Sequence, residues 1–110
     1  MNDKDYIPKQ YYTIGEVAKE LDLTTSLIRF WETEFKEVNP KKNRKGNRVY
    51  TPGDIEVIRR IQYLLKVKQY TIKGAKEKLK HDQNEIDEQI RIQETLLKLK
   101  AFLLELKDSL

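Results

Sequence analysis

Five positive side chains lie close together in the middle of this 110-residue chain, and no negative side chain interrupts them. They are Lys41, Lys42, Arg44, Lys45 and Arg48. Ammonium and guanidinium groups bind phosphate oxygens, and contacts of this kind supply most of the non-specific affinity of proteins for nucleic acid. The run alone is equally compatible with a solvated loop and with a nucleic-acid contact. The elements around it must decide between the two.

The basic run has the pattern of a short hairpin. Pro40 disfavours helix at Asn39 and begins an extended segment. Residues 41–43 and 47–50 can pair as two short strands, with a turn at residues 44–46 that contains Gly46. An isolated hairpin of this length is only marginally stable, so we expect Val49 and Tyr50 to anchor it to a core.

An amphipathic helix is predicted immediately before the hairpin, capped by Thr24 and extending to about Phe35. One face carries Leu27, Ile28, Trp31 and Phe35, which we expect to point into the core. The other face carries polar side chains and one aromatic side chain that could contact base edges or phosphates. They are Thr25, Ser26, Arg29, Phe30 and Thr33.

A shorter helix is predicted over residues 14–21, because Thr13 and Glu16 form a capping-box pattern. The two helices, separated by a tight turn, make a helix-turn-helix, and the hairpin that follows makes a wing. Residues 1–10 are predicted to be a flexible arm.

Two further helices complete the predicted head over residues 11–81. Thr51, Pro52 and Asp54 begin a helix that extends to about Val67. Thr71 begins a fourth helix, with Ala75 and Leu79 on its apolar face. These helices supply the core that the first two helices and the wing require.

The last segment, residues 84–110, is predicted to be one long helix. Its apolar side chains follow a coiled-coil spacing of 4-3-4-3-4. They are Ile92, Leu96, Leu99, Leu103, Leu106 and Leu110. Ile86, Ile90, Leu97 and Leu104 form a second, weaker stripe. We therefore expect the first stripe, called the seam, to pair with a second helix, and the second stripe to rest on a neighbouring head.

Charge is divided between these parts. Residues 1–80 hold 18 Lys and Arg against 11 Asp and Glu, whereas residues 81–110 hold 4 against 7. A basic head with a mildly acidic tail suggests that only the head meets a polyanion. There is no cysteine, which excludes disulfides and thiolate metal sites. No apolar run could span a bilayer and no signal peptide is visible, so we expect a cytoplasmic protein without membrane contact.

Enzymatic chemistry has little support in the sequence. His81 is a lone histidine at a helix end, where a cap is the simpler interpretation than a metal ligand. Glu85, Asp87 and Glu88 suit the first turn of the last helix. No phosphate-binding Gly-rich loop, nucleophile triad or metal-ligand spacing is present, so no catalytic residue, cofactor or metal is predicted.

Four motifs in order, YYTIGEVAKEL, LIRFWE, GNRVYTPGDIEVIRRI and YTIKGAKEKL, resemble the MerR family of bacterial winged-helix regulators. The resemblance covers residues 11 to about 80. It implies a homodimer joined by an antiparallel coiled coil, bound to a pseudo-palindromic operator on double-stranded DNA. It also implies a distortion of promoter DNA that realigns elements for RNA polymerase. Family members that sense small molecules carry ligands after the coiled coil, and we expect none here.

The resemblance also assigns residues. Arg29 matches the arginine of the family's recognition helix, and Arg48 matches its wing arginine. Phe30 and Trp31 occupy positions that are usually tyrosine in the family, and Asn47 occupies an aromatic position, so the family's tyrosine hydroxyls are absent at 30 and 31. The full predicted DNA-binding set is Thr13, Thr24, Thr25, Ser26, Arg29, Phe30, Trp31, Lys42, Arg44, Lys45, Asn47, Arg48 and Tyr50. Within it, we favour a core role for Trp31, a capping role for Thr24 and a wing-supporting role for Tyr50.

The sequence thus predicts a mainly α protein: a winged helix-turn-helix head of four helices and a two-stranded wing, then a long coiled-coil dimerisation helix. The predicted function is sequence-specific DNA binding in transcription regulation, in the bacterial cytoplasm at the nucleoid. Two alternatives stay open. One is an excisionase-like factor that bends DNA, and the other is a coiled-coil interaction module whose basic head binds an acidic protein.

Overall fold

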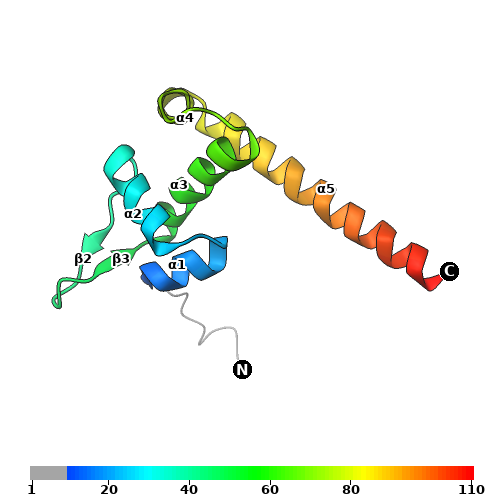
Figure 1. The fold of residues 1–110 in the computed structure, drawn as a ribbon, viewed down its shortest axis with the longest axis horizontal. Coiled ribbons are helices and arrows are strands. Elements are labelled where there is room, and N and C mark those ends of the chain that lie inside the picture. Colours follow the sequence, from blue (N-terminus) through cyan, green and yellow to red (C-terminus); the bar gives the residue numbers. More distant parts are fainter. Residues whose placement is uncertain (1–9) are drawn as a thin grey trace, which may run out of the picture. The chain divides into compact units, whose positions relative to one another are not determined.

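The structure is a computed structural model and describes residues 10–110. The predicted arm lies outside these residues, except for Gln10. Helices dominate and a small sheet joins them, as predicted (Figure 1). The elements are β1 (Tyr12–Thr13), α1 (Ile14–Leu21), α2 (Thr25–Glu34), β2 (Lys41–Lys42), β3 (Arg48–Tyr50), α3 (Pro52–Gln62), η2 (Tyr63–Val67), α4 (Ile72–His81) and α5 (Gln83–Ser109).

The chain divides into two compact units, of which the first ends at Arg59 and the second begins at Arg60. Each is described by itself below. The division that the sequence suggested, between a head ending at residue 81 and a tail beginning at residue 84, stays a prediction.

Local side-chain caps set the first two helices, as predicted. The Thr13 N–H donates to Glu16 Oε1 at 3.0 Å and the Glu16 N–H donates to Thr13 Oγ1 at 3.1 Å, which completes the capping box of α1. Asp22 ends α1 in the left-handed conformation, with φ 54°. Thr24 Oγ1 then accepts the Leu27 N–H at 3.1 Å and caps α2. The helix-turn-helix is therefore confirmed.

The wing is part of a three-stranded antiparallel sheet with the order β1-β3-β2. Lys42 pairs with Arg48 on the outer side of β3, as predicted. On its inner side, Tyr12 pairs with Tyr50. The sequence analysis did not predict β1. Because β1 leads directly into α1, the third strand ties the wing to the first helix.

The tip of the wing is closed by Asn43. Its N–H donates to the Asn47 carbonyl at 2.9 Å, and its Oδ1 accepts the N–H groups of Lys45 and Asn47, both at 3.0 Å. Gly46 follows with φ 81°, a left-handed conformation that favours glycine. The turn predicted at residues 44–46 is confirmed, and it is held by its own local hydrogen bonds.

The core of the first unit is built from α1, α2, β3 and α3. Val17, Ile28, Phe35 and Tyr50 have no exposed surface, and Trp31 is 2% exposed. The predicted core face of α2 is confirmed for three of its four residues, since Leu27 is only half-buried. A few bulky buried side chains therefore position α2 and the wing.

The helix after the wing begins and ends as predicted, but its last turn is wider. Asp54 and Thr51 exchange capping hydrogen bonds at 2.9 to 3.2 Å. From Tyr63 to Val67 the helix is a π-helix, and the Lys68 N–H donates to the Tyr63 carbonyl at 3.0 Å. Sequence periodicity had predicted an ordinary α-helix to this point.

The second unit packs the start of α5 against α4. Thr71 caps α4 by accepting the Gly74 N–H at 3.0 Å, as predicted. Ala75, Leu79 and Ile86 are fully buried. Figure 1 shows α4 and the first turns of α5 side by side in this unit, in yellow-green and yellow.

Ion pairs reinforce this packing. Arg60 donates to both carboxylate oxygens of Asp87, at 2.7 and 2.9 Å. Lys78 lies 3.4 Å from Asp82 and 3.0 Å from Glu85, and these hydrogen bonds, the one to Glu85 first, raise the pKa of its ammonium group. Carboxylates in the first turns of α5 thus bind cations of α3 and α4.

The rest of α5 extends without cover. The predicted long helix is confirmed: α5 has 27 residues, and only Asp82 separates it from α4. Every residue from 94 to 110 is exposed, and so is every side chain of the predicted seam. No helix among the described residues is long and apolar enough to cross a membrane.

Candidate nucleic-acid interface

A groove of about 350 Å³ lies where the start of α1, the middle of α2 and the wing meet. Three segments that are distant in the sequence form its walls. Its lining residues are Thr13, Ile14, Arg29, Asn43, Gly46, Asn47, Arg48 and Val49. The structure therefore brings together four members of the predicted DNA-binding set, namely Thr13, Arg29, Asn47 and Arg48.

Arg29 is available at this groove. Its side chain is exposed, and no carboxylate of residues 10–110 lies within ion-pair distance of it. Arg29 forms no surface salt bridge with Glu32 or Glu34 of the same helix. An exposed guanidinium at the wall of this groove suits a phosphate or a base edge.

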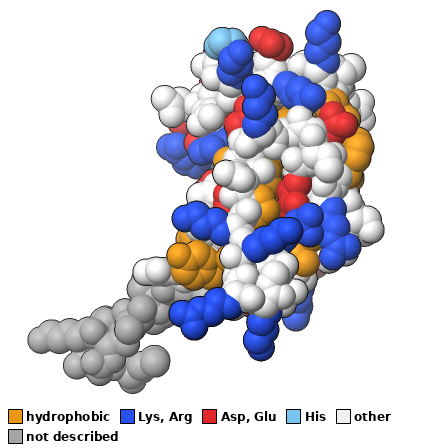
Figure 2. All heavy atoms as spheres, turned by 90° about the vertical axis from the view of Figure 1, so that its left-hand side faces the viewer, with side chains coloured by type: hydrophobic (Ala, Val, Ile, Leu, Met, Phe, Trp, Pro, Cys, Tyr) orange, Lys and Arg blue, Asp and Glu red, His pale blue; other side chains and the backbone are white. Residues whose placement is uncertain are grey.

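The wing surrounds the groove with further positive charge. All residues from 41 to 48 are exposed. Within the described part of the chain, Lys41, Lys42, Arg44 and Lys45 make no ion pair. In Figure 2, Lys and Arg side chains stand out from several places on this face, and some of them lie in its lower part, at the height where Figure 1 places the turn between β2 and β3.

One carboxylate, Glu32 of α2, lies between the groove and the core. Its Oε2 binds Arg48 Nε at 2.9 Å, and its Oε1 accepts a short hydrogen bond from the Tyr50 hydroxyl. The Glu32 side chain is only 10% exposed. Burial of Tyr50, and then its hydrogen bond to the Glu32 carboxylate, raise the pKa of the Tyr50 hydroxyl, so it stays a neutral donor.

Two predicted DNA contacts are corrected. Trp31 is 2% exposed and Tyr50 has no exposed surface, so neither side chain reaches a duplex from this fold. Both fill the core beneath α2 and the wing, which is the role the sequence analysis favoured for them. Phe30, in contrast, is 45% exposed and stays available.

The remaining predicted residues form two groups outside the groove lining. Thr24 and Ser26 are exposed and Thr25 is half-buried at the beginning of α2. Lys42, Arg44 and Lys45 lie on the wing. Thr13 and Thr24 both use their hydroxyl oxygens as helix caps, so each hydroxyl already accepts one backbone N–H.

Sequence reasoning did not find Glu32 as a partner of Arg48. The available signal was its position: Glu32 follows Ile28 by one helical turn and so flanks the apolar face of α2. A carboxylate at the edge of a core requires a cation or a hydroxyl partner, and the wing offers both.

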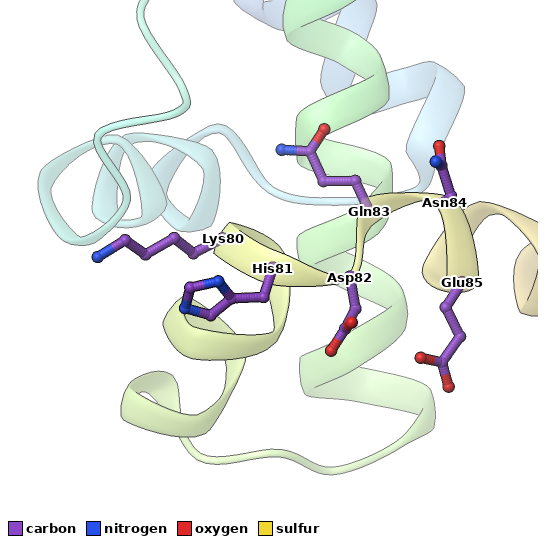
Figure 3. A pocket seen from close by; sticks show the side chains of 6 residues that line it. All are labelled: Lys80, His81, Asp82, Gln83, Asn84 and Glu85. Atoms are coloured by element: carbon purple, nitrogen blue, oxygen red, sulfur yellow. The ribbon is translucent and has the colours of Figure 1, made fainter.

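A second hollow, of about 580 Å³, lies where α4 meets α5. Figure 3 shows that its six lining side chains point in different directions, with Lys80 and His81 directed away from Glu85. Asp82 and Glu85 already bind Lys78. No group of three or more His, Cys, Asp or Glu in residues 10–110 could hold a metal ion.

A helix-turn-helix followed by a basic β-wing defines the class of winged helix-turn-helix proteins. Within that class, the sequence matches one particular family. The family described as MerR HTH family regulatory protein matches residues 12–82, and the chain belongs to this family.

Curated relatives match less than half of the chain. The HTH-type transcriptional regulators MlrA of Escherichia coli and Salmonella typhimurium are 35% identical over 51 residues. That stretch is 46% of this chain and 21% of theirs, so the match spans about a fifth of their length.

Two solved structures are similar over most of the chain. A MerR family transcriptional regulator from Bacillus thuringiensis is 27% identical, with a TM-score of 0.52, over 89% of this chain and 98% of that one. HiNmlR, a MerR family regulator lacking the sensor domain and bound to promoter DNA, is 23% identical, with a TM-score of 0.54, over 88% of this chain and 86% of that one. The second likeness supports the fold.

Proposed function

We propose that this protein is a sequence-specific DNA-binding regulator of transcription that acts as a homodimer. The observation that carries the proposal is the groove at α1, α2 and the wing, with exposed Arg29 and a wing of exposed cations. Membership of the MerR HTH family and the regulatory role of the MlrA relatives support it. No catalytic role is proposed.

Each part of the interface has a role in this proposal. The beginning of α2 enters the major groove, where Thr25, Ser26 and Arg29 contact base edges and Phe30 packs against the duplex backbone. Thr13, Thr24 and Asn47 contact the backbone. Four cations of the wing bind phosphates and are not selective for sequence. They are Lys42, Arg44, Lys45 and Arg48.

The proposed dimer forms through α5. At 1.5 Å per residue, its 27 residues give a length of about 40 Å. The exposed seam from Ile92 to Leu110 pairs with the seam of a second copy in an antiparallel coiled coil. Half-sites one helical turn apart are separated by about 34–36 Å, so such a pair suits a pseudo-palindromic operator.

The proposed dimer distorts its promoter so that RNA polymerase can engage it, and it works at the nucleoid in the cytoplasm. A promoter target is supported by the similar fold of HiNmlR, which is bound to promoter DNA.

Fluorescence anisotropy tests the proposal. The probe is labelled DNA from upstream of the protein's own gene, with excess random-sequence competitor, at several salt concentrations. If each wing neutralises about three phosphates, the dimer should lose affinity with a log–log salt slope of roughly −5. A slope near zero would contradict the phosphate contacts.

Competition separates the alternatives. Binding that survives the competitor supports a specific operator. Binding that the competitor abolishes, in DNA tiled across the gene's surroundings, would favour a DNA-bending factor or a head that binds an acidic protein.

A further inference from the structure

We propose that Glu32 is a positioning residue of the DNA-binding surface, whose carboxylate holds the Arg48 guanidinium in the orientation that meets a backbone phosphate. This inference rests on the proposed function, because it concerns how a wing cation is prepared for DNA. It adds a residue whose own charge has the wrong sign for a direct contact.

Glu32 connects the two elements that must act together on DNA. It lies in α2, the helix expected in the major groove, whereas Arg48 begins β3, the central strand of the sheet. The contact between Oε2 and Arg48 Nε is 2.9 Å. A single carboxylate therefore links the helix expected in the major groove to the base of the wing.

The core fixes the carboxylate itself. Its second oxygen accepts the hydroxyl of Tyr50, which has no exposed surface. With one oxygen held by a buried tyrosine, the carboxylate cannot rotate freely about its last torsion. Arg48 thus takes its direction from a group that is held by the core.

This arrangement avoids repulsion between Glu32 and DNA. The Glu32 side chain is 10% exposed and each oxygen has a donor, so little of its negative charge faces solvent. A guanidinium carries five N–H donors and the bond to Glu32 occupies Nε. The Arg48 side chain is 42% exposed and lines the groove, so it still has an outward face for a phosphate.

The wing contains a comparison for this effect. Arg44 and Lys45 at the tip have no carboxylate partner within residues 10–110. Their long side chains lose rotamer freedom when they bind, whereas Arg48 has lost much of that freedom already. Arg48 should therefore contribute more to DNA affinity than either tip cation.

The test is a double-mutant cycle on the full chain: the wild type, Glu32→Gln, Arg48→Ala and the combination of the two. In Glu32→Gln, the amide oxygen can still accept the Tyr50 hydroxyl, while the amide N–H₂ faces Arg48 Nε and cannot bind it. Glu34→Gln is the control, because it removes the same charge from the same helix. Affinity is measured by fluorescence anisotropy on the operator that the competition experiment of the previous subsection identifies.

We expect Glu32→Gln to weaken operator binding about fivefold to tenfold, and Arg48→Ala to weaken it about tenfold or more. The double variant should bind within about twofold of Arg48→Ala, because the two residues act as one unit. Glu34→Gln should bind as tightly as the wild type or slightly more tightly. Removing negative charge normally strengthens DNA binding, so a loss specific to Glu32 identifies positioning.

Two results would overturn the inference. Operator binding by Glu32→Gln that equals or exceeds the wild type would show that Glu32 restrains Arg48 without helping it. Losses that multiply in the double variant would show that Glu32 supports the fold independently of Arg48. Failure of the wild type to bind any specific DNA would instead count against the proposed function.

Thermal unfolding, followed by circular dichroism, checks that each variant is folded. If Glu32→Gln does not fold, two other variants replace it. One is the single variant Tyr50→Phe, and the other is the double variant Tyr50→Phe with Glu32→Ala. Without its hydroxyl, residue 50 needs no acceptor, so the second change leaves no buried donor without a partner. The same fivefold to tenfold weakening is expected within this pair, and equal affinities would overturn the inference.

Discussion

The wing and the last helix are both exposed, but they are exposed in opposite ways. Residues 41–48 present cations and no carboxylate, on a hairpin tied by β1 and Tyr50 to a buried core. Residues 92–110 present nine large apolar side chains at the end of α5, and no part of residues 10–110 covers them. The wing is complete as a folded element, whereas the end of α5 is not.

This difference indicates two kinds of partner. Exposed cations on a packed element are stable in water, and a polyanion is the partner that suits them. Exposed leucines at coiled-coil spacing are unfavourable in water, and an apolar helix is the partner that suits them. The four predictions that follow test the two surfaces separately, in order of decreasing effect.

Replacing Leu99 and Leu103 with Lys should abolish the dimer. Each leucine removed from an apolar interface costs about 1.5–3 kcal/mol, and the dimer loses four, so the total cost of about 6 kcal/mol or more should raise the dissociation constant at least about 10⁴-fold. Analytical ultracentrifugation measures the change. Glu105→Lys, on the same helix but outside both stripes, is the control and should stay dimeric. Dimers that survive the double change would show that α5 pairs through another face.

On the wing side, Arg48→Ala and Arg29→Ala should differ in kind. Arg48→Ala should weaken operator and random DNA alike, by about tenfold or more, because it removes a phosphate contact. Arg29→Ala should weaken operator binding more than random binding, and so lower the specificity ratio. Lys100→Ala, which removes one positive charge outside the groove and wing, is the control. Equal ratios for the two arginine variants would argue against Arg29 as a contact to bases.

The anchored beginning of α5 should behave as part of a core. Asp87→Ala removes the two-pronged contact to Arg60, whose side chain is 16% exposed, and should cost about 1–2 kcal/mol. Urea unfolding measures this loss. Glu88→Ala, which removes a 58% exposed carboxylate from the same turn, should change stability by less than about 0.5 kcal/mol. Equal losses would mean that the Arg60 contact adds little.

The core beneath the wing should be sensitive to alkali. The pKa of the Tyr50 hydroxyl is raised above its ordinary value of 10.0 by burial and by Glu32. The stability that the neutral Tyr50 hydroxyl contributes to the folded protein is complete well below pH 10. It declines as pH rises further, because this tyrosine then ionises in the unfolded chain and stays neutral in the folded one. The free energy of unfolding should fall by about 1 kcal/mol between pH 10 and pH 11.

The matched variant for this measurement is Tyr50→Phe. It lacks the titrating hydroxyl but keeps every other ionisable group, so its urea midpoint should decline less steeply over the same interval. Parallel declines in the two proteins would show that Tyr50 does not titrate differently on unfolding.

Local signals in the sequence predicted most of the fold. The predicted helix caps are all present, because capping depends on side chains within one turn. They are Thr13 with Glu16, Thr51 with Asp54, Thr24 and Thr71. Asn43 and Gly46 likewise determine the wing turn, Asn43 through its local hydrogen bonds and Gly46 through its left-handed backbone conformation. The long α5 was predictable because its apolar spacing extends over the whole segment.

What the sequence did not show depends on contacts between distant residues. Strand β1 has two residues and exists only because Tyr12 pairs with Tyr50. No local pattern in the sequence predicts the π-helix that begins at Tyr63. The role of Glu32 depends on which residues face it after folding. The candidate site was therefore predicted as a set of exposed residues, but the carboxylate behind it was not.

The closed turn of the wing has an evolutionary consequence. Asn43 shapes the tip by accepting the N–H groups of Lys45 and Asn47 at its side-chain oxygen, and Gly46 shapes it through its left-handed backbone conformation. Arg44 and Lys45 take no part in the core, so their identities can drift without cost to folding. The tip is thus a module in which related chains can exchange charge and retune their targets while the scaffold stays unchanged.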